Sequence, residues 1–246
     1  MAETLLSPGV LARENDLSAV TAQPIQAGAA IIGPTVKGPV GIPTLVTSYS
    51  EYAQAFGTTF LSASLQQEFL TSNSAYNYFN NGGTTLLVTR VVSGSFTSAT
   101  STNISGSGVA VATSFTLKTF GEGEIMNSSG SEVDGALVSG SSDNLRWEVA
   151  GFSTSSGTFS LLIRRGDDNT SEKTVLESYS NLSLDPTAPN YISKVIGDSY
   201  KTINTNDTTP YVQDNGTFPN RSRYVYVSAV NAKTPQYFDN KSIEVV

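Results

Sequence analysis

The chain has 246 residues, a formal net charge of −7, and neither cysteine nor histidine. The lack of these two residue types excludes a disulfide framework, thiolate or imidazole metal ligands and His-based acid–base catalysis within the chain. The acidic balance also argues against nucleic acid as a partner, because phosphate binding needs clustered basic side chains and the Lys and Arg residues here are scattered.

Residues 1–22 are predicted to form an extended arm. Pro8 has no backbone N–H and disfavours a helical Ser7, while Gly9 adopts positive φ without strain. An extended segment needs another sheet to satisfy its N–H and C=O groups, so we expect the arm to pair with a neighbouring subunit. The predicted arm residues are Leu5, Leu6, Ser7, Pro8, Gly9, Val10, Leu11, Glu14 and Asp16, with hinges at Pro8, Gly9 and Pro24.

Residues 23–93 are predicted to form a small α/β core segment. Short apolar runs at 27–33 and 44–47 indicate two strands separated by a Gly/Pro loop. N-cap candidates at 48–51 and a stop at Gly57 predict one short helix that includes Tyr52 and Phe56.

A second helix is predicted from the near-helical spacing of apolar side chains between Leu65 and Phe79. Ser62 or Ser64 would cap its start and Gly82 would close its end. This helix would cross over to a β-branched strand at 86–92, which gives the segment its α/β character.

Residues 94–230 are predicted to form a mostly antiparallel β outer domain, followed by a linker at 231–246 that returns towards the core. Alternating or β-branched runs mark five strands, at 109–120, 145–152, 158–165, 173–179 and 224–230. A turn at 166–169 separates two of them, and 191–196 favours a helical turn. The expected fold class is therefore α+β, with an arm, an α/β core segment and a β-rich outer domain.

Two oxygen-rich groups are weak candidates for Ca²⁺ ligation, and solvated acidic turns are the favoured interpretation of both. They consist of Asp167, Asp168, Asn169 and Glu172, and of Asn206, Asp207, Asp214 and Asn215. The Arg165-Gly166-Asp167 tripeptide is expected to be the tip of a β-hairpin. We expect no catalytic residue, no metal and no cofactor, so the chain is not predicted to be an enzyme.

Four sequence pieces, in their order and spacing, resemble the N-terminal portion of contractile phage tail sheath proteins of T-even-type myoviruses. They are Leu5-Leu6-Ser7-Pro8-Gly9-Val10 with Glu14; Gly28-Ala29-Ala30-Ile31-Ile32-Gly33; Gly38-Pro39 with Pro43-Thr44-Leu45-Val46-Thr47-Ser48 and Phe56-Gly57; and Ala75-Tyr76-Asn77-Tyr78-Phe79-Asn80-Asn81-Gly82-Gly83 leading into Leu87-Val88-Thr89-Arg90-Val91-Val92. Weaker similarity continues at 159–165 and 190–196.

The resemblance implies a virion structural protein that assembles in the host cytoplasm into stacked hexameric rings around the tail tube. Contraction of that sleeve would drive the tube through the host envelope during genome ejection. The implied partners are further copies of the chain, the tail tube protein, and baseplate and tail terminator proteins, with no nucleic acid and no membrane insertion.

The resemblance also implies a long C-terminal region that completes the core and faces the tube. We do not find it in these residues, so we expect either a piece of a longer chain or a short relative. Two other functions remain open: a sheath from a related contractile injection device, and a β-rich receptor- or glycan-binding decoration module on a virion surface.

Overall fold

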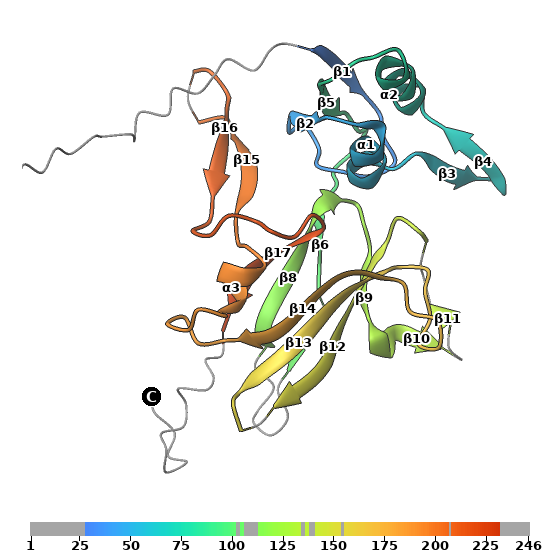
Figure 1. The fold of residues 1–246 in the computed structure, drawn as a ribbon. Helices are drawn as coiled ribbons and strands as arrows, with labels where there is room; N and C mark the ends of the chain where they lie inside the picture. The colour runs from blue at the N-terminus through green and yellow to red at the C-terminus, as the bar shows by residue number, and fades with distance from the viewer. Residues whose placement is uncertain are drawn as a thin grey trace, which may run out of the picture.

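The computed structural model describes residues 28–101, 104–105, 113–133, 136–137, 141–153, 155–206 and 208–231. These residues fold around two separate hydrophobic cores, one in an α/β unit and one in a larger β body (Figure 1). Few helices and mostly antiparallel sheets confirm the predicted α+β class. The predicted domain boundaries themselves stay predictions.

The α/β unit is built on a three-stranded sheet in the order β1-β5-β2. Strand β5 runs parallel to β1 and antiparallel to β2, so the parallel crossover leads from β1 and spans both helices. The sequence instead suggested a crossover from the 44–47 strand through the second helix alone. The elements are β1 (Ala29–Gly33), β2 (Thr44–Val46), α1 (Tyr49–Phe56), β3 (Thr59–Ser62), β4 (Leu65–Glu68), α2 (Leu70–Asn80) and β5 (Leu86–Arg90).

Helix α1 begins and ends where its sequence predicts. The Ser48 hydroxyl accepts a hydrogen bond from the Glu51 N–H at 3.2 Å, and Gly57 follows the helix with φ of 70°. Tyr52 and Phe56, four residues apart on one face, are completely buried against the sheet.

The prediction that the second helix starts near Ser62 or Ser64 is wrong. Residues 59–68 form the antiparallel β3–β4 hairpin instead, and Ala63 and Ser64 make its turn with φ of 49° and 65°. Helix α2 starts only at Leu70 and has no side-chain cap. Gly82, with φ of 88°, follows its C-terminus as expected.

The β body contains two sheets, ordered β14-β13-β12-β9 and β17-β8-β6, with β7 also paired to β8. Two small hairpins, β10–β11 and β15–β16, stand apart from both sheets. The elements are β6 (Ser98–Thr100), β7 (Ile104–Ser105), β8 (Thr113–Glu122), β9 (Met126–Ser128), η1 (Ser129–Ser131), β10 (Glu132–Val133), β11 (Ala136–Leu137), β12 (Leu145–Ser153), β13 (Thr158–Arg165), β14 (Val175–Ser183), α3 (Ile192–Val195), β15 (Tyr200–Asn204), β16 (Tyr211–Asn215) and β17 (Val225–Val230).

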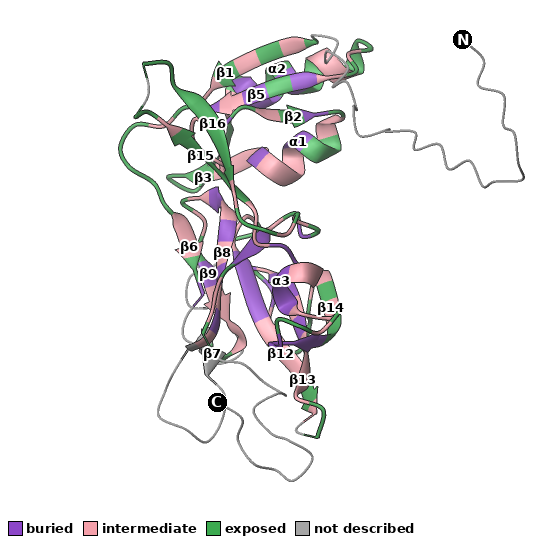
Figure 2. Ribbon diagram, turned by 90° about the vertical axis from the view of Figure 1, so that its left-hand side faces the viewer, coloured by how far each residue is buried: buried purple, intermediate pink, exposed green. Residues whose placement is uncertain are grey.

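The core of the β body lies between these two sheets and α3, and its buried strands run through the centre of Figure 2. Phe115 of β8 stacks on Phe159 of β13 with ring centroids 5.4 Å apart. The strands predicted at 145–152, 158–165, 173–179 and 224–230 are confirmed, with boundaries shifted by a few residues. The strand predicted at 109–120 is confirmed from Thr113 onward, because 109–112 lie outside the described residues.

The β15–β16 hairpin, which the sequence did not predict, stands beside the α/β unit in both views (Figures 1 and 2). The two units approach closely at Gly41, where an added Cβ would lie 3.2 Å from Ile203 Cδ1. The hairpin therefore forms one wall of the space between the two cores.

Candidate functional site

The α/β unit and the β body meet at a polar joint. Among the described residues, none belongs to both hydrophobic cores. Arg90, at the end of β5, is only 5% exposed. Its Nη1 donates to the carbonyl oxygens of Gly38 at 2.7 Å and Glu122 at 2.8 Å. One guanidinium thus ties the loop after β1 to the end of β8.

The surroundings of Arg90 explain how a buried cation is tolerated there. Burial lowers the pKa of Arg90, and the nearby Glu122 and Glu124 carboxylates oppose that shift. The guanidinium also lies 5.6 Å from the centroid of the Phe96 ring, a cation–π distance. Because an arginine stays protonated in proteins, the joint is held by a permanent charge.

Gln54 of α1 makes the second contact across the joint. Its Nε2 donates to the Tyr224 hydroxyl at 2.7 Å, and its Oε1 accepts from Arg223 Nη1 at 3.1 Å. Lys37 Nζ lies 3.5 Å from Asp143 Oδ1 and adds an ion pair. These neutral and charged contacts fix the two units relative to each other with little apolar burial.

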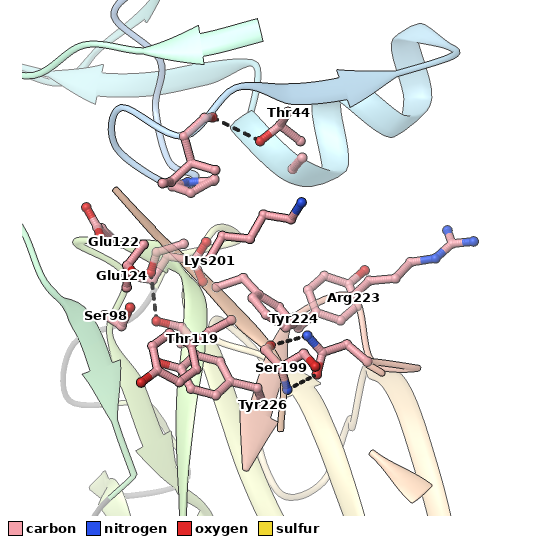
Figure 3. Close-up of a pocket in the computed structure, with 18 of the residues that line it drawn as sticks. Thr44, Ser98, Thr119, Glu122, Glu124, Ser199, Lys201, Arg223, Tyr224 and Tyr226 are labelled. Carbon is pink, nitrogen blue, oxygen red and sulfur yellow. Dashed lines mark hydrogen bonds between the residues drawn. The ribbon is translucent and has the colours of Figure 1, made fainter. Parts of the chain in front are cut away.

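A cavity of about 460 Å³ lies within this joint (Figure 3). The α/β unit contributes the loop before β2 and part of α1, and the β body contributes β8, β15 and the segment before β17. Tyr226 forms part of the floor, stacked on Tyr200 with ring centroids 5.2 Å apart. Burial raises the pKa of Tyr226. The cavity is therefore walled by aromatic rings and open to polar ligands.

Two carboxylates, Glu122 and Glu124, also line the cavity. Burial raises the pKa of both, and that of Glu124 reaches about 7, although Lys37 opposes the shift. Glu124 can therefore exchange a proton near neutral pH. No group of three or more carboxylate, His or Cys side chains suited to a metal occurs in the part of the chain that the structure describes.

The predicted turn at 166–169 joins β13 to β14, so the Arg165-Gly166-Asp167 tripeptide lies at a hairpin tip as expected. The neighbouring Asp168, in contrast, has a fully buried side chain. Asp168 accepts from Arg146 Nη1 at 3.0 Å and from Arg164 Nε at 2.8 Å. The interpretation of Asp168 as a solvated acid is wrong, and both of its oxygens are already bonded to arginines rather than free for Ca²⁺.

Further carboxylates complete this buried charge network. Arg164 Nη1 donates to Glu148 Oε2 at 2.8 Å, Lys173 Nζ donates to Glu148 Oε1 at 2.8 Å, and Arg146 pairs with Glu132. The network links the β13–β14 tip to the start of β10. Its role is to hold the fold of the β body.

The second oxygen-rich group is spread along a hairpin. Asp214 of β16 is 76% exposed at its side chain and pairs with Lys201 at 3.4 Å. Asn215 donates to Thr202 Oγ1 at 2.9 Å, and Asn206 lies in the loop between the strands. Asp207 lies outside the described residues. Asp214 and Asn215 thus make cross-strand contacts, and the Asn206 N–H donates to Asn204 Oδ1 beside it, so the described members do not converge on one point.

The predicted arm lies outside the described residues, and so does its hinge. This applies to Leu5, Leu6, Ser7, Pro8, Gly9, Val10, Leu11, Glu14, Asp16 and Pro24. The sequence pattern does not single out the residues of the joint. It places Arg90 only within a strand, and no sequence signal pairs Gln54 with Tyr224, which are 170 positions apart.

Comparisons with known proteins found no matching family model and no matching curated protein. Among solved structures, the chain is similar to the sheath tail protein from Desulfitobacterium hafniense, with 12% sequence identity and a TM-score of 0.31. The match covers 92% of this chain and 40% of the other, so the chain spans less than half of that protein's length. With a TM-score this low, the match does not establish the fold, which is defined here by the chain's own sheets and cores. Within the described residues, no helix has the length and hydropathy needed to cross a membrane.

Proposed function

We propose that the chain is a structural subunit of a contractile tail sheath. In this proposal it polymerises as stacked hexameric rings around a tail tube, and contraction of the stack drives the tube through the host envelope. Its partners are further copies of the chain, the tube protein, and the baseplate and tail terminator proteins. No catalysis, cofactor or nucleic acid is assigned to it.

One observation carries the proposal. The stronger sequence pieces that resemble tail sheath proteins, apart from the arm, lie in the α/β unit: they supply β1, β2, the end of α1, the C-terminal half of α2, and β5. Segments up to about sixty residues apart in the chain thus form one sheet and one core. The weaker pieces at 159–165 and 190–196 lie in the β body, at β13 and α3.

The polar joint supports the same proposal. A subunit that remains connected while its parts reorient needs an interface of hydrogen bonds, and not a continuous apolar core, between rigid bodies. Arg90 and Gln54 provide such contacts, and the cavity beside them leaves room for movement.

Electron microscopy of the negatively stained, purified product of the complete open reading frame tests the proposal. We expect hollow, striated tubes. Discrete globular particles at high protein concentration would reject it. Deletion of residues 1–20 should abolish tubes and leave the protein soluble, whereas normal tubes from this variant would show that the arm is not required.

A second candidate, a glycan-binding decoration module, is favoured by one feature only. The joint cavity combines stacked tyrosines with carboxylates, a combination suited to sugar rings and hydroxyls. Saturation-transfer NMR with an oligosaccharide panel checks this function. Glycan binding that is lost in Tyr226→Ala, together with a monomeric state, would favour this candidate over the sheath.

A further inference from the structure

Within the described residues, the chain passes from the α/β unit to the β body only once, through residues 91–97, which contain no helix or strand. Gly94 lies in the middle of this segment with φ of 99°, and an added Cβ there would meet no atom within 4 Å. A glycine in open space can change its backbone angles at little steric cost. The connection is therefore suited to act as a hinge between the two units.

The contacts that close this hinge are polar. Besides the hydrogen bonds of the Arg90 and Gln54 side chains, a backbone hydrogen bond crosses the joint, from the Glu122 N–H to the Gly38 carbonyl oxygen at 3.2 Å. Such groups exchange their protein partners for water when an interface opens, so each adds little net free energy to the closed form. The balance between a closed and an open joint therefore depends on the charged groups that remain.

Among the described residues, Glu124 is the charged group of the joint cavity that has no partner of its own (Figure 3). Its carboxyl group folds back over Gly121, into space that a Cβ at that position would fill. No hydrogen bond or ion pair joins this carboxyl group to another described residue. Glu124 is thus confined in the joint without being neutralised there.

The charged groups that face Glu124 come from both units. Lys37 and Arg90 of the α/β unit attract a carboxylate at this position, and Asp143 of the β body repels one. The other charged or titratable side chains of the cavity are Glu122, Lys201, Asp214 and Arg223, with Tyr200, Tyr224 and Tyr226. Both attracting cations already have partners at the joint, an aspartate and two carbonyl oxygens, so neither is free to pair with Glu124.

Confinement of an unpaired carboxyl group favours its neutral form, because moving a carboxylate out of water without a partner costs free energy. The pKa of Glu124 agrees with this geometry, since burial raises it to about 7. An opened joint returns the carboxyl group to water, where its pKa is 4.5. The closed joint thus holds a proton that the open joint has released between about pH 4.5 and 7.

We propose that Glu124 makes the joint a pH-dependent switch, in which the protonated side chain allows the two units to close and its ionisation favours an open arrangement that pivots about residues 91–97. The inference concerns the joint alone and does not depend on the sheath function. Because the closed form binds the extra proton, closing is favoured at low pH and weakened as the pH rises through this window. From about pH 5.5 to about pH 8.5, the equilibrium constant for closing should fall about 30-fold.

Distance measurements by double electron–electron resonance test the proposal, since the chain has no native cysteine to interfere with labelling. Ser74→Cys in α2 and Ser155→Cys in the β12–β13 turn place one nitroxide on each unit at exposed positions. We expect the distance distribution of this pair to gain a second population as the pH rises from about 5.5 to about 8.5. The same labels combined with Glu124→Gln should give the low-pH distribution at both pH values.

Matched controls separate this response from general effects of pH. Glu172→Gln changes an exposed carboxyl group away from the cavity and should retain the pH response. Labels at Ser155 and Ser171, both in the β body, should give a distance that does not change with pH. Trp147 fluorescence checks that the β body stays folded under both conditions.

A Gln54→Ala background makes the measurement more sensitive. It removes the hydrogen bonds to Tyr224 and Arg223, so the open fraction should rise at every pH. Identical distributions at the two pH values in both backgrounds would overturn the proposal. An equal shift with and without Glu124→Gln would also overturn it, because another group would then control the joint.

Discussion

The α/β unit and the β body differ in how completely each encloses its core. Among the described residues, the β body packs two sheets and α3 around a core cluster of thirteen buried apolar residues and closes one end with a buried charge network. The core cluster of the α/β unit holds six, and helices cover only one face of its sheet. Within the described residues, the β body encloses its core, whereas the α/β unit leaves an edge and a face of its sheet exposed. In the proposed sheath function, the exposed part is where other chain segments would bind, while the enclosed part stays intact.

The largest effect on folding stability is expected in the β body, from Asp168→Asn. This change leaves Arg146 and Arg164 buried without their shared carboxylate, which should destabilise the β body by about 3–5 kcal/mol. Urea unfolding followed through Trp147, the single tryptophan, measures it. Asp167→Asn, on the exposed side of the same turn, should change little, and equal effects of the two would refute the role of the network.

Arg90→Met tests whether the two regions are coupled through the joint. Removing the guanidinium leaves the Glu122 carbonyl oxygen without this donor and the Gly38 carbonyl oxygen with only the Glu122 N–H, a loss of about 2–3 kcal/mol. We expect the unfolding of the two cores to separate into two transitions, with hydrogen exchange reporting β5 and Trp147 fluorescence reporting the β body. A single, merely shifted transition would show that other contacts maintain the coupling.

The pH dependence of the joint follows from Glu124. Burial raises the pKa of its carboxyl group to about 7 in the folded protein, so the folded state holds a proton that the unfolded state has released between about pH 4.5 and 7. The stability contributed by this group is therefore lost as pH rises through that window.

Glu124→Gln removes the ionisable carboxyl group, and with it the loss of folding stability that accompanies its deprotonation. The variant should be more stable than the unmodified chain by about 1–2 kcal/mol at pH 8, with the difference shrinking towards pH 4.5. Urea unfolding at several pH values measures the trend, with the exposed Glu172→Gln as control. A pH-independent difference would contradict the assignment.

The smallest effect concerns the β3–β4 turn. Ala63 and Ser64 both have positive φ, which is unfavourable for residues that carry a Cβ. Ser64→Gly should stabilise the hairpin by about 1 kcal/mol, seen as slower hydrogen exchange in β3 and β4. Faster exchange would support the helix that the sequence predicted there.

Local patterns predicted much of the fold, and long-range contacts explain most of what they missed. The Ser48 cap and Gly57 stop located α1, and alternation located β12, β13 and β17. The β3–β4 hairpin was missed because Ala63-Ser64 lacks the Asn or Gly that marks such turns. The β15–β16 hairpin was missed because its strands are polar and largely exposed, which leaves little apolar alternation to detect.

The candidate site could not be predicted in the same way. The joint brings Arg90, Gln54 and Glu124 near one another only through the packing of the α/β unit against the β body, and no spacing rule links them. The buried Asp168 was mistaken for a solvated acid because turn acids are usually exposed. The arm was predicted from backbone chemistry alone and stays a prediction.

Hydrogen exchange of the β1 amides, measured in dilute protein and in assembled protein, tests most directly whether assembly covers the open region of the α/β unit. We predict fast exchange at 29–33 in dilute protein and strong protection after assembly, with β12 and β13 protected in both states. Equal exchange at 29–33 in the two states, alongside intact assemblies, would contradict the account.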